Sequence, residues 1–513
     1  MKTKLLEKSE LFLKLTMLLI ASASVLSFII VAIIRINYPY ELEWIEEGIL
    51  AHVMRVIQGQ PIYVHPTLEY VPFIYPPLFY YLSAFLANII GAGYAPLRII
   101  SFLSSLGIAA IVFLFVKRET KDLLSSFIAS SFFISCYSAV LFWYDIGRVD
   151  VLTLFLFFSF LYLIRFYSSY IIYMVAGILI TLSFLSKQEG LPLSIPIIIY
   201  LYFIDWRKAI VLTVSLILSL MFAVILLDYI NNSIFSYYTI SLPLKILKNS
   251  IQPTRLISIW TKDLIKPIPI LISLYIYFLL FAKKYLTDKR YTFYIVISIC
   301  IILGCLPYRT IRYGNSNALM PAFIILAIVS GIAFFLIKTQ LETSSLDIKN
   351  KLKIMFYFVV IIHFILLIYT PVEVLPTETQ RANEEKLIAE ISKIKGEVFI
   401  PSHSYLATFA GKRESAHISG LDDLLSSDDS MYRNYLFNDL MNALKEQRYG
   451  AIVTDQFWFT NGGEIMKQMS KYYEVERDED GMVKTYRLSN QDFSRPTIIF
   501  IPRNTPSNDS PAP

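Results

Sequence analysis

The chain has 513 residues, of which 56% are hydrophobic and only 17% are charged. A typical soluble domain is about half apolar and a quarter charged, and it is shorter than this chain. The net charge is +6, but the sequence has no basic block with interleaved aromatic residues, so we expect no nucleic-acid partner. Apolar runs of about 18 residues or more recur along the chain. These features predict an α-helical polytopic membrane protein.

The first apolar run follows four lysines and has no small-residue cleavage site after it, so it is expected to be a retained anchor with a cytoplasmic N-terminus. Segment 76–90 is apolar but short, which is typical of an interfacial helix. If it does not cross, the basic loops at 117–121, 207–208, 283–290 and 338–353 all lie in the cytoplasm, as the positive-inside bias requires. About eleven transmembrane helices are then predicted, at 15–34, 98–116, 124–143, 151–168, 170–186, 191–205, 209–230, 266–282, 291–307, 319–338 and 354–371.

The first external loop, residues 37–97, opens with a cluster of carboxylates. Glu43, Glu46 and Glu47 precede or begin a helical pattern that runs to Gln58, and their i, i+3, i+4 spacing places at least two of them on one face. Clustered carboxylates raise one another's pKa, which is useful in a general base. Acids at the start of a helix also stabilise its dipole, so a structural role remains open.

Charged residues also occur in three later external turns. The basic residues among them oppose the positive-inside trend, and charges at a membrane mouth tend to line substrate paths. Arginine and lysine there suit a phosphate headgroup. We therefore predict an external site that holds carboxylates and cations together. Its candidate members are Asp145, Arg148 and Asp150 in 143–150, Lys187 and Gln188 in 186–190, and Arg312 in 308–317.

The composition changes near residue 371, where charged residues return. Strand-like runs at 397–401 and 451–454 and helix-like runs at 384–394 and 435–447 predict a small extracytoplasmic α/β domain over 372–491. It follows a transmembrane domain at 1–371, and residues 492–513 are expected to form a disordered tail. Ser402, His403 and Asp422 are triad residue types, but no nucleophile elbow surrounds the serine.

Several short motifs follow one another on the predicted outer side. They are Glu46-Glu47 with Glu43 a turn earlier, Gly59-Gln60-Pro61-Ile62-Tyr63, Tyr75-Pro76-Pro77-Leu78-Phe79-Tyr80-Tyr81, Arg148-Val149-Asp150 and Ser186-Lys187-Gln188. In this order they resemble the GT-C superfamily of membrane glycosyltransferases. The resembled branch contains the protein O-mannosyltransferases and lipid A aminoarabinose transferases, which use polyprenyl-phosphate-linked sugars. The resemblance covers roughly residues 10–340 and implies two amphipathic helices in the first external loop.

The resemblance also implies a reaction on the outer face of the cell membrane. A first-loop glutamate, one of Glu43, Glu46 and Glu47, takes the proton of an acceptor hydroxyl on a glycan, lipid or protein in one inverting displacement. The branch commonly has Asp-Glu at this motif, so the identity of the base stays open. The branch's lysine before Pro-Pro is replaced by Tyr75, so another cation must contact the lipid phosphate. The candidates, in order, are Lys187, Arg148 and Arg312.

Two further questions stay open at this level. No Asp-x-Asp pair occurs in the external loops of the membrane part, so no cofactor is expected, although Glu43, Glu46 and Asp150 could converge on a divalent metal. A transporter or flippase of a lipid-linked or polar substrate is the alternative function, because charges at helix mouths mark transport paths too. The absence of an inverted repeat favours the glycosyltransferase.

Overall fold

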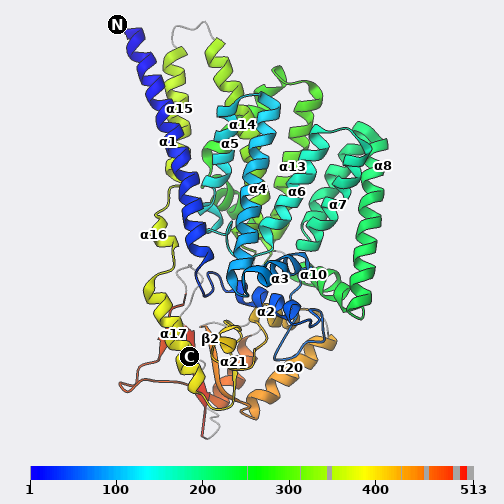
Figure 1. Cartoon of the computed structure of the whole chain (residues 1–513), viewed down its shortest axis with the longest axis vertical. Helices are drawn as coiled ribbons and strands as arrows, with labels where there is room; N and C mark the ends of the chain where they lie inside the picture. Colours follow the sequence, from blue (N-terminus) through cyan, green and yellow to red (C-terminus); the bar gives the residue numbers. More distant parts are fainter. Residues whose placement is uncertain are drawn as a thin grey trace.

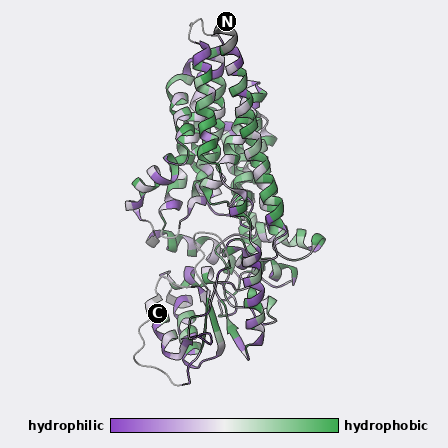
Figure 2. Cartoon of the chain, turned by 90° about the vertical axis from the view of Figure 1, so that its left-hand side faces the viewer, coloured by the Kyte–Doolittle hydropathy of each residue, from purple (hydrophilic) through white to green (hydrophobic). Residues whose placement is uncertain are grey.

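The computed structural model describes residues 2–250, 252–311, 314–343, 349–428, 430–455, 462–488 and 497–504. A helical bundle occupies one end of the elongated molecule, the C-terminal domain occupies the other, and the N-terminus lies at the far end of the bundle (Figure 1). Hydrophobic residues dominate the bundle, whereas the C-terminal domain is mixed (Figure 2). This distribution is that of a membrane bundle with a more polar domain at one end.

Ten helices form the bundle in the described part of the chain. They are α1 (Lys2–Ile36), α4 (Tyr94–Thr120), α5 (Leu123–Ser135), α6 (Asp150–Phe166), α7 (Tyr170–Ser186), α8 (Gly190–Ile230), α12 (Pro269–Phe281), α13 (Asp288–Thr310), α14 (Met320–Thr343) and α15 (Lys349–Leu366). Helix α14 is at the centre, with every side chain from Met320 to Phe334 buried. By length and composition, seven segments within the described residues can cross a membrane, and a bent pair, 253–265 with 269–284, makes an eighth.

The number of predicted spans, eleven, exceeds the seven or eight segments that pass by length and composition. The difference lies in α6, α7 and α8. Helix α8 has 41 residues, but its path breaks at Asp205, where φ is −155° and ψ is 85°. Tyr202 donates a hydrogen bond to Thr213 across the break (3.2 Å), so the two halves fold back on each other. They correspond to the predicted spans 191–205 and 209–230. Helices α6 and α7 coincide with two more predicted spans but have only 17 residues each.

The first loop contains two short helices, α2 (Ile45–Ile57) and α3 (Leu78–Ile90). Each has 13 residues and is about 20 Å long, which is too short to cross the hydrocarbon layer. Both lie at the end of the bundle that faces the C-terminal domain (Figure 1). Segment 76–90 therefore forms a short helix as predicted, and Ile45, Ile49 and Val53 on one face of α2 are buried.

Short helical turns connect the bundle helices and lead into the C-terminal domain. They are η1 (Ser138–Val140), α9 (Ile234–Ser236), η2 (Tyr237–Ser241), α10 (Leu242–Ser250), η3 (Pro253–Arg255), α11 (Leu256–Ser258), η4 (Ile259–Ile265), η5 (Ala282–Lys284), η6 (Ser316–Leu319) and α16 (Pro371–Val374). Of these, η2 and η4 have the wider turns of a π-helix. Such turns are frequent at functional sites.

The C-terminal domain is a small mixed sheet covered by helices. Its elements are α17 (Glu378–Lys393), β1 (Glu397–Phe399), α18 (Leu406–Phe409), α19 (Ile418–Leu425), α20 (Ser430–Lys445), β2 (Tyr449–Asp455), α21 (Gly462–Tyr472), β3 (Tyr473–Val475), β4 (Thr485–Tyr486) and β5 (Thr497–Pro502). The strand order is β1-β2-β5-β3, with β4 also paired to β5. Strands β1 and β2 are parallel, and the pairs that include β5 are antiparallel.

Strand β5 corrects the predicted disordered tail at 492–513. Ile498, Ile499 and Phe500 are buried, and the strand joins β2 to β3. The six-residue strand is apolar, but the residues around it are rich in Asn, Ser and Pro, so the average composition of 492–513 is that of a disordered tail. The domain therefore continues through residue 502, beyond the predicted boundary at 491. Residues 492–496 and 505–513 of the predicted tail lie outside the described residues.

The C-terminal domain packs directly on the first loop. The backbone N–H of Ala416 donates to the carbonyl of Leu68 (2.8 Å), and the His417 ring stacks on Trp44 with 5.6 Å between centroids. Gly48 of α2 lies at this contact, because a Cβ there would be 2.1 Å from the Phe73 ring and 3.0 Å from the His417 ring. Only glycine permits this approach.

Replacing Gly48 by alanine is expected to lower the free energy of unfolding by about 1–3 kcal/mol, the usual range for overpacking in a dense core. The better helix propensity of alanine, about 1 kcal/mol, offsets only part of this loss. Thermal unfolding of the purified chain measures it. Gly463→Ala is the matched control, because no atom lies within 4 Å of a Cβ at that helical position. Equal melting temperatures for the two variants would contradict the close contact.

Candidate active site

Five charged side chains form a chain of ion pairs where the first loop meets the bundle. Arg148 donates to Glu43 (Nη1 to Oε2, 3.0 Å) and to Asp150 (Nε to Oδ2, 3.2 Å). Lys187 donates to Asp150 (Nζ to Oδ1, 2.7 Å) and to Glu189 (Nζ to Oε2, 3.1 Å). We call these five residues the Arg148 network. It joins the start of α2 to the N-termini of α6 and α8 and the C-terminus of α7.

Glu43 is the carboxylate of this network with an unused oxygen. Its Oε2 accepts from Arg148 and from the backbone N–H of Ile45 (3.2 Å). Its Oε1 is buried and has no hydrogen-bond partner among the described residues. Burial raises the pKa of Glu43 to about 7, and Arg148 opposes the rise. Glu43 can therefore accept a proton through Oε1 near neutral pH.

Lys187 is the cation of the network that a ligand can reach. Its side chain is 15% exposed, compared with 5% for Arg148. Burial lowers the pKa of Lys187, but the charges of Asp150 and Glu189 raise it by more than burial lowers it. The ammonium group therefore stays charged. Burial raises the pKa of Tyr75, and Arg148 and Lys187 lower it, so this half-buried residue is within electrostatic range of both cations. An anionic group entering the site would meet Lys187 first.

Glu46 belongs to a different cluster. Arg98 donates to both of its oxygens, at 3.1 Å from Nε and 2.8 Å from Nη2. The backbone N–H groups of Leu42 and Gly147 also donate to it. Burial raises the pKa of Glu46, but these partners lower it by more. Glu46 is thus a fully paired buried carboxylate with no spare acceptor.

Asp145 lies with this second cluster and not in the Arg148 network. It accepts from Arg35 (2.9 Å) and from the hydroxyl of Tyr137 (2.6 Å). Arg98 in turn donates to the carbonyl of Arg35 (2.9 Å). We call Arg35, Arg98, Glu46 and Asp145 the Arg98 cluster. It fastens α1, α2 and α4 to the 143–149 turn.

Glu47 points to the C-terminal domain. Its Oε2 accepts from the backbone N–H of Tyr405 (3.0 Å), and its Oε1 accepts from the hydroxyl of Tyr94 (3.3 Å). The three first-loop glutamates thus have three different sets of partners. The shared face predicted from their spacing is wrong for Glu43, because α2 begins at Ile45 and Glu43 precedes the helix.

The other predicted site residues have structural contacts or lie outside the described residues. Gln188 donates through Nε2 to the carbonyls of Ile74 and Thr239 (2.9 Å for the latter), so it ties the first loop to η2. Arg312 lies outside the described residues. Glu43, Glu46 and Asp150 do not converge on one metal, because Arg148 bridges Glu43 and Asp150 and Arg98 holds Glu46.

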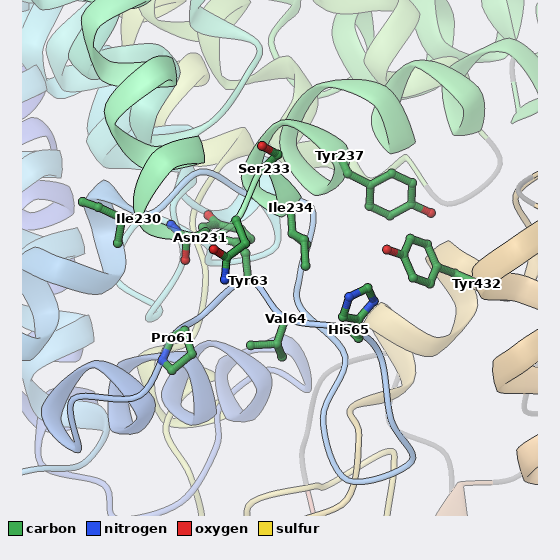
Figure 3. A pocket seen from close by; sticks show the side chains of 11 residues that line it. Pro61, Tyr63, Val64, His65, Ile230, Asn231, Ser233, Ile234, Tyr237 and Tyr432 are labelled. Carbon is green, nitrogen blue, oxygen red and sulfur yellow. The ribbon is translucent and has the colours of Figure 1, made fainter.

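A cavity of about 520 Å³ lies between the first loop, the C-terminal end of α8 and the C-terminal domain. Its lining includes Tyr63 and His65 of the first loop, Tyr237 of η2 and Tyr432 of α20. Tyr237 and Tyr432 pack edge to face on one side of the cavity, with 4.9 Å between their ring centroids (Figure 3). The hydroxyl of Tyr63 donates to the carbonyl of Tyr75 (2.7 Å), which ties the cavity wall to the segment before α3. Aromatic faces with polar edges are suited to a sugar ring.

Three charged residues of these clusters, Arg35, Arg98 and Glu189, are not among the candidates from the sequence. Glu189 stands next to the predicted Lys187-Gln188 pair. Arg35 directly follows the predicted span 15–34, and Arg98 is the first residue of the predicted span 98–116. An arginine at a span boundary is itself a signal, because a charge there needs a partner.

Comparisons with known proteins agree with this architecture. Residues 75–229 match the family model of dolichyl-phosphate-mannose-protein mannosyltransferases. The crystal structure of ArnT from Cupriavidus metallidurans bound to undecaprenyl phosphate superposes with a TM-score of 0.59 and 10% identity, over 94% of this chain and 97% of that one. Its apo state gives 0.54 and 11% over the same shares. No curated protein matches the chain.

The family match contains Tyr75, Arg148, Asp150 and Lys187 but begins after the first-loop glutamates. The structural likeness extends over both the bundle and the C-terminal domain. Together they confirm the resemblance noted in the sequence. The chain is a multi-pass membrane protein whose fold is similar to that of ArnT over nearly its whole length.

Proposed function

We propose that the chain transfers a sugar from a polyprenyl-phosphate donor to an acceptor hydroxyl. The observation that carries this proposal is the Arg148 network, which places an unused carboxylate oxygen and two cations in one site. The family match over residues 75–229 supports it, and so does the likeness to a protein that binds undecaprenyl phosphate. The acceptor is a hydroxyl of a glycan, lipid or protein.

In the proposed reaction, Oε1 of Glu43 takes the proton of the acceptor hydroxyl. The acceptor oxygen forms a bond to the anomeric carbon while the bond from that carbon to the phosphate oxygen breaks, so the configuration is inverted. The polyprenyl phosphate leaves with the electron pair. Lys187 and Arg148 stabilise the negative charge that develops on it. Tyr75, whose pKa both cations lower, helps to position the phosphate.

The site is proposed to face the outside of the cell membrane. Basic residues gather at the opposite end of the bundle, where Arg165 pairs with Glu119 (2.5 Å), Lys338 with Asp122 (2.7 Å) and Lys353 with Glu10 (3.2 Å). By the positive-inside rule this end, with the N-terminus, is cytoplasmic. The Arg148 network and the C-terminal domain are then extracytoplasmic.

Replacing Lys187 by glutamine is expected to lower kcat by about 10²–10³-fold, the usual loss when one group that stabilises developing charge is removed. Lys187→Arg keeps the charge and should retain much more activity. Transfer from a labelled donor measures both variants at matched expression. Equal loss in the two variants would show that the lysine acts by shape and not by charge.

The proposed function is tested with purified wild-type protein in proteoliposomes that contain radiolabelled polyprenyl-phosphate sugars. Transfer of label to an acceptor hydroxyl supports the glycosyltransferase. A transporter or flippase would instead move intact labelled lipid or solute across the bilayer with time. Such movement without transfer from any donor would overturn the proposal.

A further inference from the structure

A second cluster of ionisable groups lies between the first loop and the C-terminal domain, apart from the Arg148 network. Glu41, Glu47 and His403 are buried, and one ligand atom of each lies within 4.8 Å of the others. Glu41 and Glu47 come from the first loop, and His403 comes from the turn after β1. Residues that are more than 350 positions apart in the chain thus meet at one point.

Glu41 and His403 make a close, buried contact in this cluster. Nδ1 of His403 lies 2.7 Å from Oε1 of Glu41, yet this nitrogen has no hydrogen-bond partner of acceptable angle in the described part of the chain. The other ring nitrogen, Nε2, contacts Oδ1 of Asp455 (2.9 Å). Histidines that bind metals usually hold a carboxylate on their second nitrogen in this way.

Glu384 of α17 is an independent sign that a cation belongs in this cluster. Its side chain is fully buried, and neither carboxylate oxygen has a hydrogen-bond partner within the described residues. Burial and the charge of Glu41 raise the pKa of Glu384, and His403 lowers it, so this carboxylate is within electrostatic range of the cluster. A buried carboxylate without a partner is costly, and a metal ion removes that cost.

We propose that Glu41, Glu47 and His403 bind a divalent transition metal of the Zn²⁺ or Mn²⁺ type. One imidazole with two carboxylates suits these ions better than Ca²⁺ or Mg²⁺, which prefer oxygen ligands alone. The metal joins α2 to the C-terminal domain. The proposal does not rest on the glycosyltransferase function, because it concerns contacts outside the Arg148 network.

The test measures the metal content of the full-length chain in detergent after treatment with EDTA and reloading with Zn²⁺ or Mn²⁺. The wild type is expected to retain about one ion per chain after removal of excess metal, and its melting temperature should rise on reloading. Glu41→Gln and His403→Gln should each weaken binding by at least about 100-fold, because loss of a supporting partner alone costs 10–100-fold. Glu189→Gln, outside the cluster, should bind as the wild type does.

The wild-type measurements decide the question even if a variant fails to fold. No retained ion, together with a melting temperature that does not respond to either metal, would overturn the proposal. An ion that is retained equally by the wild type, Glu41→Gln and His403→Gln would also overturn it, because the ion would then bind elsewhere.

Discussion

Glu43→Gln is expected to lower the rate of sugar transfer by about 10²–10⁴-fold, the usual contribution of a general base. Glutamine keeps the size of the side chain and can still accept the hydrogen bond from Arg148, but it cannot take a proton at Oε1. Donor binding should change little, because Lys187 and Arg148 remain in place. The rate is measured under saturating donor, and donor affinity is measured separately.

The melting temperature of the Glu43→Gln variant is the control for folding. The melting temperature should fall little for two reasons. The neutral amide that replaces the carboxylate needs no countercharge, and Arg148 keeps Asp150 as its own countercharge. A variant with native stability and native transfer would rule out Glu43 as the base.

Glu46→Gln is expected to act on folding instead of chemistry. Both Glu46 and Arg98 have side chains with no exposed surface, and the substitution leaves the guanidinium buried without its countercharge. Breaking a buried pair in this way costs about 3–5 kcal/mol of unfolding free energy. Thermal or chemical unfolding of the purified protein measures the loss.

A surface pair provides the matched control for Glu46. Glu385 pairs with Arg381 at 3.1 Å on α17, but both side chains are about half exposed. Such a helical surface pair contributes only about 0.3–0.5 kcal/mol, so Glu385→Gln should unfold almost as the wild type does. A Glu46→Gln protein as stable as Glu385→Gln would contradict the structural role of the Arg98 cluster.

The membrane architecture follows from the sequence because long apolar segments and basic loops are local features. The short helix at 76–90 and the hairpin at Asp205 were both visible as interruptions of that pattern. Strand β5 was missed because its pairing with β2 and β3 is a long-range contact, whereas its neighbours in sequence are polar. Composition averages over such short apolar segments.

The site was predicted in part for similar reasons. Arg148, Asp150 and Lys187 carry charges at span ends, where any charge is conspicuous, and the structure brings them together with Glu43. The roles of the three glutamates depend on where α2 begins and on which residue of another segment faces each of them. The meeting of Glu41 with His403 depends on how the C-terminal domain docks, which no local pattern encodes.

The most direct test of the central claim compares single-turnover transfer by Glu43→Gln and Glu189→Gln with equal amounts of bound donor. Both substitutions remove one buried carboxylate charge from the same network, and each removed carboxylate pairs with a cation. If Glu43 is the base, transfer falls by at least about 10²-fold in Glu43→Gln and by far less in Glu189→Gln. Equal losses in the two variants would show that the network needs only its charge balance, and would contradict a base at Glu43.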